Sequence, residues 1–228
     1  MLGQLIYCAG VRGRPAAELM QLYGLPVMRI SLSPEGFWAE RRLKQAGRWF
    51  SRSGIRRVLV PDGFERWNIL QRYGIAPVEP LPFLKAHAAK LAIAALERQG
   101  IRKEKSSVAL RGIEVEREMA AAAEELCPVI KDLCISVYRG GKELRNRLRM
   151  EYGIAVLPDS DCMDAVVRFH SETADGGRIV LNLFSERLDL CGISVTVNGI
   201  EPEETQRLPL LAALWENGRI DSSELEFT

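Results

Sequence analysis

The second half of the sequence alternates short apolar runs with helical segments, and this alternation constrains the fold more than any other feature. An apolar run at Ser107 to Leu110 precedes a helical pattern from Glu114 to Leu126, and a run at Leu133 to Tyr138 precedes another from Lys142 to Tyr152. A third run follows at Ile154 to Leu157. A helix between two strands returns the chain to the same end of the sheet, so such strands lie parallel. We therefore expect an α/β protein with largely parallel sheets and flanking helices.

A short motif of tyrosine, glycine and apolar residues occurs three times, beginning at Tyr23, Tyr73 and Tyr152. Each copy follows a segment of helical character and precedes an apolar one. Glycine reaches the left-handed conformation without a Cβ penalty, which suits the residue just past a helix. The motif predicts three helix ends that lead into strands.

Residues 1–80 are expected to form a small α/β lobe. Its expected elements are a strand at Gln4 to Ala9, a helix from about Pro15, a strand at Pro26 to Leu32, a helix from about Pro34 to Ser51, a strand at Arg57 to Val60, a helix from about Phe64 to Arg72 and an extended piece at Ile75 to Val78.

Residues 81–105 are expected to connect this lobe to a second domain at residues 106–228. Leu81 to Gln99 is rich in alanine and leucine, with apolar residues around most of its circumference, and predicts a buried helix. The charged segment from Gly100 to Ser106 predicts a solvated link.

The last third of the sequence predicts further strands of the second sheet. They are expected at Ala165 to Phe169, Ile179 to Phe184 and Gly192 to Val197, with a helix near Pro209 to Trp215. The last two strands could pair as an antiparallel edge, because Glu186 to Cys191 is too short for a helical crossover.

The composition argues against several classes of partner. The 31 basic and 30 acidic side chains nearly cancel, which leaves no net field to hold nucleic acid or an anionic membrane. The five cysteines are odd in number and far apart, without a CxxC pair, which is typical of reduced thiols. No apolar run approaches the ~18 residues of a membrane span. We expect a soluble cytoplasmic protein that binds no metal, nucleic acid or membrane.

Ligands of open α/β sheets bind beyond the carboxyl ends of the strands, near the point where the strand order reverses. In the first lobe this rule selects Pro61-Asp62-Gly63, and in the second half it also selects the acidic turn Asp159-Ser160-Asp161. A solvated turn is the simpler interpretation of that acidic turn, since Mg²⁺ sites usually assemble from separated strands with a bound phosphate. The candidate ligand-binding residues are Arg111, Gly112, Arg139, Gly140, Gly141, Lys142, Arg168 and His170.

Two passages within Ser107 to Ser171 read VALRGIEVEREMAAAAEEL and LCISVYRGGKELRNRLRMEYGIAVLP. They resemble the Rossmann domains of the shikimate dehydrogenase and glutamyl-tRNA reductase kind. In those domains a strand leads into a glycine-rich turn and a helix, and the second strand ends in a basic residue that contacts an adenosine phosphate. The resemblance implies a Rossmann-like second domain, with Arg139 placed to meet the 2′-phosphate of a bound NADP.

The glycine fingerprint of dinucleotide binding is degenerate in this sequence. It needs three glycines, for the tight turn, for the approach to the pyrophosphate and for the contact between helix and strand. If Gly112 is the first, Glu114 and Arg117 occupy the other two positions. Glu116 and Glu118 add further negative charge at the helix start, where it repels phosphate. NAD(P) binding in the usual mode is therefore disfavoured.

The stronger anion candidate is Arg139-Gly140-Gly141-Lys142. Its two glycines free the backbone to form a concave array of N–H groups at a helix start, flanked by two cations. The alternative is a flexible turn that happens to be basic. Arg111 could likewise hold a carboxylate or phosphate, or pair with a nearby acid such as Glu114.

No catalytic residue can be assigned from the sequence. If the strand continues past it, His170 shares a face with Arg168 and could act as a general acid or base. His87 has no Cys or Asp partner at metal spacing, and a core or solvent-edge histidine is the simpler interpretation. Cys8 and Cys162 lack a neighbouring histidine that would activate them, and we expect buried thiols.

These observations favour a non-catalytic α/β protein that binds a small anionic ligand through basic glycine turns. One alternative is a divergent NAD(P)-dependent oxidoreductase, supported by the resemblance and by Arg139. The other is an assembly or regulatory module, including a homo-oligomer, that uses the degenerate domain as an interaction surface.

Overall fold

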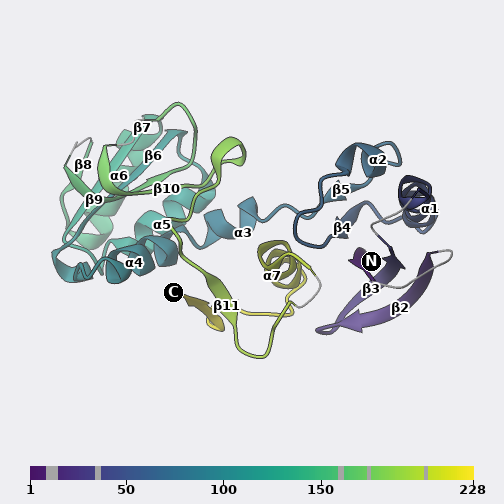
Figure 1. Ribbon diagram of the computed structural model, residues 1–228. Coiled ribbons are helices and arrows are strands. Elements are labelled where there is room, and N and C mark those ends of the chain that lie inside the picture. Colours follow the sequence, from purple (N-terminus) through teal and green to yellow (C-terminus); the bar gives the residue numbers. More distant parts are fainter. Residues whose placement is uncertain (9–14, 34–36, 159–161, 174–175, 203–204) are drawn as a thin grey trace. The chain divides into compact units, whose positions relative to one another are not determined.

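A computed structural model describes residues 1–8, 15–33, 37–158, 162–173, 176–202 and 205–228 of the chain (Figure 1). The chain divides into two compact units. The first unit consists of Met1–Pro80 and Val197–Glu224, and the second of Leu81–Thr196 and Leu225–Thr228.

The first unit is built on a five-stranded sheet in the order β2-β3-β1-β4-β5. The strands β1, β3, β4 and β5 are parallel to one another, and β2 pairs antiparallel with β3 at one edge. The elements of this unit are β1 (Leu2–Tyr7), β2 (Ala16–Leu22), β3 (Leu25–Leu32), α1 (Ala39–Arg52), β4 (Arg57–Leu59), α2 (Trp67–Gln71), β5 (Ala76–Pro77) and α7 (Arg207–Glu216).

Close packing of α1 on this sheet depends on Gly3 in β1. A Cβ at Gly3 would lie 2.7 Å from Cγ2 of Val58 and 2.9 Å from a ring carbon of Phe50, which is on α1. Phe50 is fully buried in one core cluster with Leu5 and Ile30. Helix α7 is tied to the same unit by an ion pair of 2.6 Å between Glu216 and Arg57 on β4.

The helix expected from about Pro15 is wrong, because Ala16–Leu22 forms the edge strand β2. Tyr23 and Gly24 form the two-residue turn of a β2–β3 hairpin, with φ values of 49° and 75°. Positive φ at both positions is the requirement of a type I′ hairpin turn, and it uses the same conformational freedom of glycine as a helix end does. The expected helix ends at the other two copies of the motif are confirmed. Gly74 follows α2 and Gly153 caps α6, with φ values of 71° and 68°.

The second unit contains a five-stranded, fully parallel sheet in the order β10-β9-β6-β7-β8. Counted from the first of these strands in the chain, the order is 3-2-1-4-5, which is the strand order of Rossmann-like folds. The elements of this unit are α3 (Leu81–Ala86), α4 (Ala88–Arg98), η1 (Lys103–Lys105), β6 (Ser107–Glu114), α5 (Arg117–Leu126), β7 (Asp132–Arg139), α6 (Gly141–Tyr152), β8 (Val156–Leu157), β9 (Met163–Arg168), β10 (Gly177–Asn182), η2 (Ser185–Arg187), β11 (Val195–Val197) and β12 (Leu225–Phe227).

The expected α/β class with largely parallel sheets is confirmed, and the antiparallel edge lies in the first unit. The strand β10, which was expected to pair with the next strand as an antiparallel edge, lies parallel to β9. The strand β11 instead pairs with β12 in a separate two-stranded sheet. The single helix expected over Leu81 to Gln99 is two helices, α3 and α4, which are interrupted at His87.

Candidate functional site

Two arginines stand side by side at the carboxyl ends of the central strands of the second unit. Arg111 on β6 is the register partner of Arg168 on β9, and the strand order reverses between these two strands. Register partners on neighbouring parallel strands point to the same face of the sheet. Both residues are buried, with 2% of Arg111 and 6% of Arg168 exposed. The structure therefore brings together two candidate residues that the sequence selected separately.

Ser136 and Asn182 extend the pair to a polar row across four strands. Ser136 on β7 is the partner of Arg111, and Asn182 on β10 is the partner of Arg168. Oδ1 of the buried Asn182 accepts a hydrogen bond of 3.1 Å from Nη1 of Arg168. Sequence reasoning missed Asn182, although a polar residue at the end of an apolar run is a signal. Only the pairing of β9 with β10 shows that Asn182 hydrogen-bonds to Arg168.

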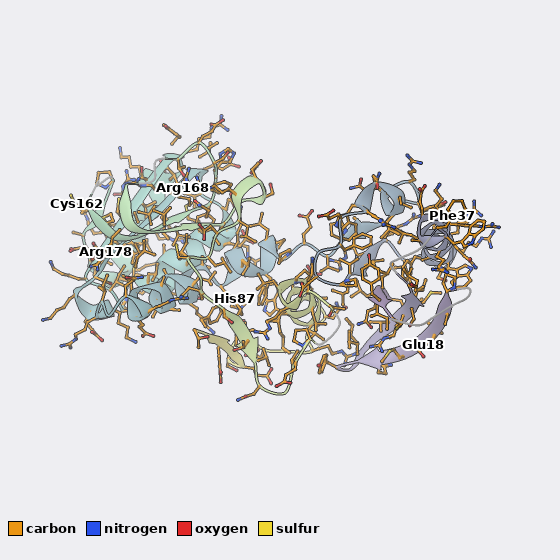
Figure 2. All side chains as sticks on the ribbon, viewed as in Figure 1. Glu18, Phe37, His87, Cys162, Arg168 and Arg178 are labelled. Carbon is orange, nitrogen blue, oxygen red and sulfur yellow. The ribbon has the colours of Figure 1, made fainter. Side chains whose placement is uncertain are left out.

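Arg168, which Figure 2 labels, holds the chain that follows β9 through its guanidinium. Its Nε donates to Oγ1 of Thr173 at 3.1 Å, and its Nη2 donates to the carbonyl oxygens of Ser171, at 2.8 Å, and of Thr173. The guanidinium also lies over the ring of Phe184, 5.3 Å from its centroid. These groups are neutral and belong to the turn after β9 and to the end of β10. Arg168 therefore fixes the connection between these two strands.

The same connection lies against Arg111. A Cβ at Gly176 would stand 2.9 Å from Nη1 of Arg111, so the backbone at Gly176 approaches the guanidinium directly. The backbone N–H of Phe169 donates to the carbonyl of Arg111 at 2.8 Å. In open α/β sheets that bind dinucleotides, the switch point is a crevice for the ligand. Here, part of the connection from β9 to β10 occupies it.

The turn from β6 to α5 differs from a phosphate-binding turn in its glycine and its charge. A Cβ at Gly112 would lie 2.7 Å from Cε of Met119 on α5, so this glycine allows close packing of the helix on the strand. Glu116 is the N-cap residue of α5, and its carboxylate forms an ion pair of 2.6 Å with Lys85. The N–H of Val115 donates to the carbonyl of Arg139 at 3.1 Å. The start of α5 therefore carries a carboxylate that is paired with Lys85.

The turn from β7 to α6 carries two glycines and two basic side chains. Gly140 is the N-cap residue of α6 with a φ of 76°, and no side chain caps the helix. Gly141 begins the helix in close contact with β7, because a Cβ there would lie 2.6 Å from Cγ2 of Val137. Arg139 and Lys142 are exposed on either side of the two glycines. Arg139 approaches Glu114 at 4.0 Å, a loose ion pair between largely exposed groups.

Both histidines hydrogen-bond to the backbone through Nδ1. His170 lies in a bend beyond the end of β9, and its Nδ1 accepts from the N–H of Glu172 at 3.3 Å. The strand β9 ends at Arg168, so His170 does not share a strand face with it. His87 is 3% exposed, and its Nδ1 lies 2.8 Å from the carbonyl oxygen of Phe83. Burial lowers the pKa of His87, as expected of a core histidine.

The remaining candidates are cysteines and the acidic turn at Asp159-Ser160-Asp161. Cys8 is half-buried and Cys162 is exposed, so the expectation of buried thiols is wrong for Cys162. Burial, with a smaller contribution from Glu124, raises the pKa of Cys127 to about 11. Asp159 and Asp161 lie outside the described residues. Within the described ranges, no group of three His, Cys, Asp or Glu side chains could hold a metal ion.

No protein-family model matches the sequence, and no curated protein matches it. Among the described helices, none has the length and apolar character needed to cross a membrane.

Solved structures with similar folds include three dehydrogenases. L-tryptophan dehydrogenase from Nostoc punctiforme is 16% identical with a TM-score of 0.35, and the match covers 70% of this chain and 51% of that one. A UDP-glucose dehydrogenase from Pyrobaculum islandicum is 13% identical with a TM-score of 0.34, covering 64% and 33%. Shikimate dehydrogenase 1 from Peptoclostridium difficile is 10% identical with a TM-score of 0.31, covering 86% and 83%.

This chain spans about half the length of the first of these proteins and a third of the second. Such identities and TM-scores are too low to transfer a substrate or the role of a residue. The Rossmann-like character of the second unit is therefore carried by its own strand order.

Proposed function

We propose that this protein binds a small anionic ligand at the turn between β7 and α6 and catalyses no reaction there. The observation that carries the proposal is the start of α6, which has no side-chain cap and begins between two exposed cations. A helix start of this kind offers backbone N–H groups and the positive end of the helix dipole to an anion. Arg139 and Lys142 add exposed positive charge on both sides.

The two glycines give this turn its shape. Gly140 adopts the left-handed conformation, and Gly141 lies too close to Val137 for any larger residue to fit without a shift. Successive N–H groups in such a turn form a concave surface that suits a phosphate or carboxylate. The nearby Glu114 competes only weakly for Arg139, since an exposed pair at 4.0 Å contributes little.

The comparison with α5 supports a site at α6 and not at the usual dinucleotide position. The two helices follow neighbouring strands of one sheet, yet α5 begins at Glu116, which is paired with Lys85, whereas α6 begins at two glycines. A pyrophosphate at α5 would have to displace this carboxylate. This arrangement disfavours the alternative of a divergent NAD(P)-dependent oxidoreductase.

The proposal is tested by titrating inorganic pyrophosphate into the full chain at low salt, with isothermal calorimetry as the readout. Replacing both cations in Arg139→Ala/Lys142→Ala should weaken binding at least tenfold, because two charge-assisted contacts are lost. The matched control is Arg149→Ala/Lys105→Ala, which removes the same charges at exposed positions of the same unit. It should change the affinity less than twofold.

Three results would overturn the proposal. They are equal binding by the Arg139→Ala/Lys142→Ala variant, equal loss in the control, and no binding of pyrophosphate at 10 mM. NADP(H) binding more than a hundredfold tighter than pyrophosphate would instead favour the oxidoreductase. Native mass spectra of the freshly purified protein would show a retained anion, and the same spectra give its oligomeric state.

A further inference from the structure

The strand β2 forms an open edge of the first sheet (Figure 1). It pairs with β3 over all seven of its residues, from Ala16 to Leu22, without a bulge. Among the described residues, no strand pairs with its other side. The edge of a sheet presents unpaired backbone N–H and C=O groups, which are a template for another strand. The outer side of β2 is therefore a surface to which a further strand can be added.

The hairpin fixes which backbone groups of β2 point outward. In a hairpin with a two-residue turn, the pair that flanks the turn is hydrogen-bonded, and hydrogen-bonded pairs then alternate along the strands. The flanking pair here is Leu22 with Leu25. The backbone groups of Ala17, Leu19 and Gln21 therefore point away from β3, and their N–H groups donate to no residue within the described ranges. Each of the three offers one donor and one acceptor to a further strand.

The edge lacks the features that commonly prevent strand addition. Lysine, proline and bulges on an edge strand keep other chains away. The segment Ala16–Leu22 contains none of these, and Glu18 is its one charged residue. Leu19, in the middle of the strand, is 74% exposed. An edge strand of seven residues with an exposed apolar centre is a site of association.

Leu19 extends an apolar row on one face of the sheet. Its register partner on β3 is Met28, which packs against the core cluster that includes Phe50 of α1. The partner of Met28 on β1 is Gly3, where the absence of a Cβ admits Phe50. Register partners point to the same face of a sheet. A second apolar side chain beside Leu19 would remove it from water and continue this row.

The sequence of β2 is complementary to itself when reversed. If two copies of β2 pair antiparallel about a two-fold axis at Leu19, small side chains face large ones and no like charges face each other. All outward-pointing backbone groups are then paired, because the outward-pointing residues form the hydrogen-bonded pairs. The facing pairs are Leu19 with Leu19, Ala17 with Gln21, Ala16 with Leu22 and Glu18 with Met20.

The two neighbouring registers that pair the same backbone groups are less favourable. An axis at Glu18 places two carboxylates directly opposite each other, which is destabilising. An axis at Met20 places Ala16 and Ala17 opposite the turn of the other copy, so fewer residues pair. Charge and strand length therefore select the register that is centred on Leu19.

The hairpin is held in place at its turn. The hydroxyl of Tyr23 donates to the carbonyl of Glu201 at 2.9 Å, which ties the hairpin to a segment 178 residues further along the chain. A second copy brings an equally ordered strand, whereas a flexible peptide would have to be ordered on binding. Dimers in which one surface faces itself across a two-fold axis are the commonest soluble oligomers.

We infer that this protein forms a two-fold symmetric dimer through β2, with the axis at Leu19. The dimer joins two five-stranded sheets into one continuous sheet. Its interface consists of the backbone ladder between the two copies of β2 and of the Leu19 side chains, which face each other. This surface lies in the first unit and is independent of the anion site at α6.

The test is sedimentation velocity of the full chain between 5 and 200 µM, where we expect a dimer that dissociates on dilution. Leu19→Lys should weaken the dimer at least tenfold, because it replaces an apolar contact at the axis with two facing like charges. Leu19→Glu should do the same. The matched control is Met150→Lys, an apolar-to-lysine change at an 86% exposed position of α6, which should leave the dissociation constant unchanged.

An equimolar mixture of Leu19→Lys and Leu19→Glu shows whether residue 19 faces its own counterpart. Opposite charges meet at the axis in the mixed dimer, so the mixture should associate at least tenfold more tightly than either variant alone. Recovery of the dimer also shows that both variants are folded. Gln21→Pro removes one outward N–H from each copy, keeps the pairing with β3 and should weaken the dimer about tenfold.

The inference is overturned by a monomer at 200 µM of the unaltered chain, or by an unchanged dissociation constant in Leu19→Lys or Gln21→Pro. It is also overturned if the mixture associates as weakly as its two components, because residue 19 then does not lie at a two-fold axis.

Discussion

At the scale of single residues, three charged side chains near the carboxyl edge of the second sheet have different roles. Arg168 is buried and donates to a turn and to Asn182, which gives it a structural role. Glu116 is paired with Lys85 at the start of α5. Arg139 is largely exposed and only loosely paired, which leaves it able to meet a ligand. Burial and pairing therefore separate residues that looked equivalent in the sequence.

The sequence selects residues at this edge because the rule for ligand sites in open sheets depends only on strand direction. It did not separate Arg111 and Arg168 from Arg139, since burial depends on which segments cover each position. The covering connection after β9 has no apolar periodicity of its own. The position of this connection is shown by the contact of Gly176 with Arg111 and by the hydrogen bond of Thr173 with Arg168.

The buried histidine gives a prediction about pH. Burial, the largest effect, lowers the pKa of His87 below its ordinary value of 6.5, and Lys90 lowers it further, while the hydrogen bond to Phe83 opposes the shift. Below about pH 6.5, the unfolded chain therefore takes up a proton at His87 more readily than the folded chain does. The free energy of unfolding should fall as the pH decreases through this range.

Urea unfolding at pH 7.5 and pH 5.5 measures this effect. His87→Asn keeps an N–H donor near the carbonyl of Phe83 but does not titrate, so its stability should depend less on pH than that of the unaltered protein. An equal pH dependence in both proteins would exclude His87 as a cause.

At the scale of elements, the connection between β9 and β10 departs most from a Rossmann-like pattern. Parallel neighbours usually require a crossover of a dozen residues or more with a helix. Here only residues 169–176 join the two strands, and in their described part there is no helix. In the described part of this connection, Arg168 donates hydrogen bonds to Ser171 and Thr173.

Asn182→Ala tests this role of Arg168. It removes the acceptor from a buried guanidinium and should lower the free energy of unfolding by about 2 kcal/mol. Asn182→Asp keeps an acceptor and should lose less, and the exposed Asn146→Ala on α6 serves as the control. Equal stabilities of Asn182→Ala and the control in urea unfolding would mean that the hydrogen bond between Arg168 and Asn182 does not stabilise the fold.

The repeated tyrosine-glycine motif shows where local reasoning reaches its limit. Gly74 and Gly153 end helices as expected, but Gly24 closes a hairpin. All three are left-handed, so the conformation of the residue was predictable and the element before it was not. Ala16–Leu22 has good helix formers, yet pairing with β3 makes it an edge strand, as tertiary contacts often override propensity.

At the scale of the whole molecule, each unit repeats one plan, a mainly parallel sheet with helices packed on it. The parallel strands were predictable, because alternating periodicity is a local property. The membership of α7 in the first unit was not, since it depends on contacts such as that between Glu216 and Arg57, which are far apart in the chain.

The central claim is that the second unit binds an anion at the start of α6 and not at the start of α5. The most direct test is a ¹⁵N NMR titration of the full chain with inorganic pyrophosphate. We predict the largest shifts at the backbone amides of Gly141, Lys142 and Glu143, with little change at Arg117 and Glu118. The largest shifts at the α5 amides, or none at either helix start at 10 mM, would contradict the account.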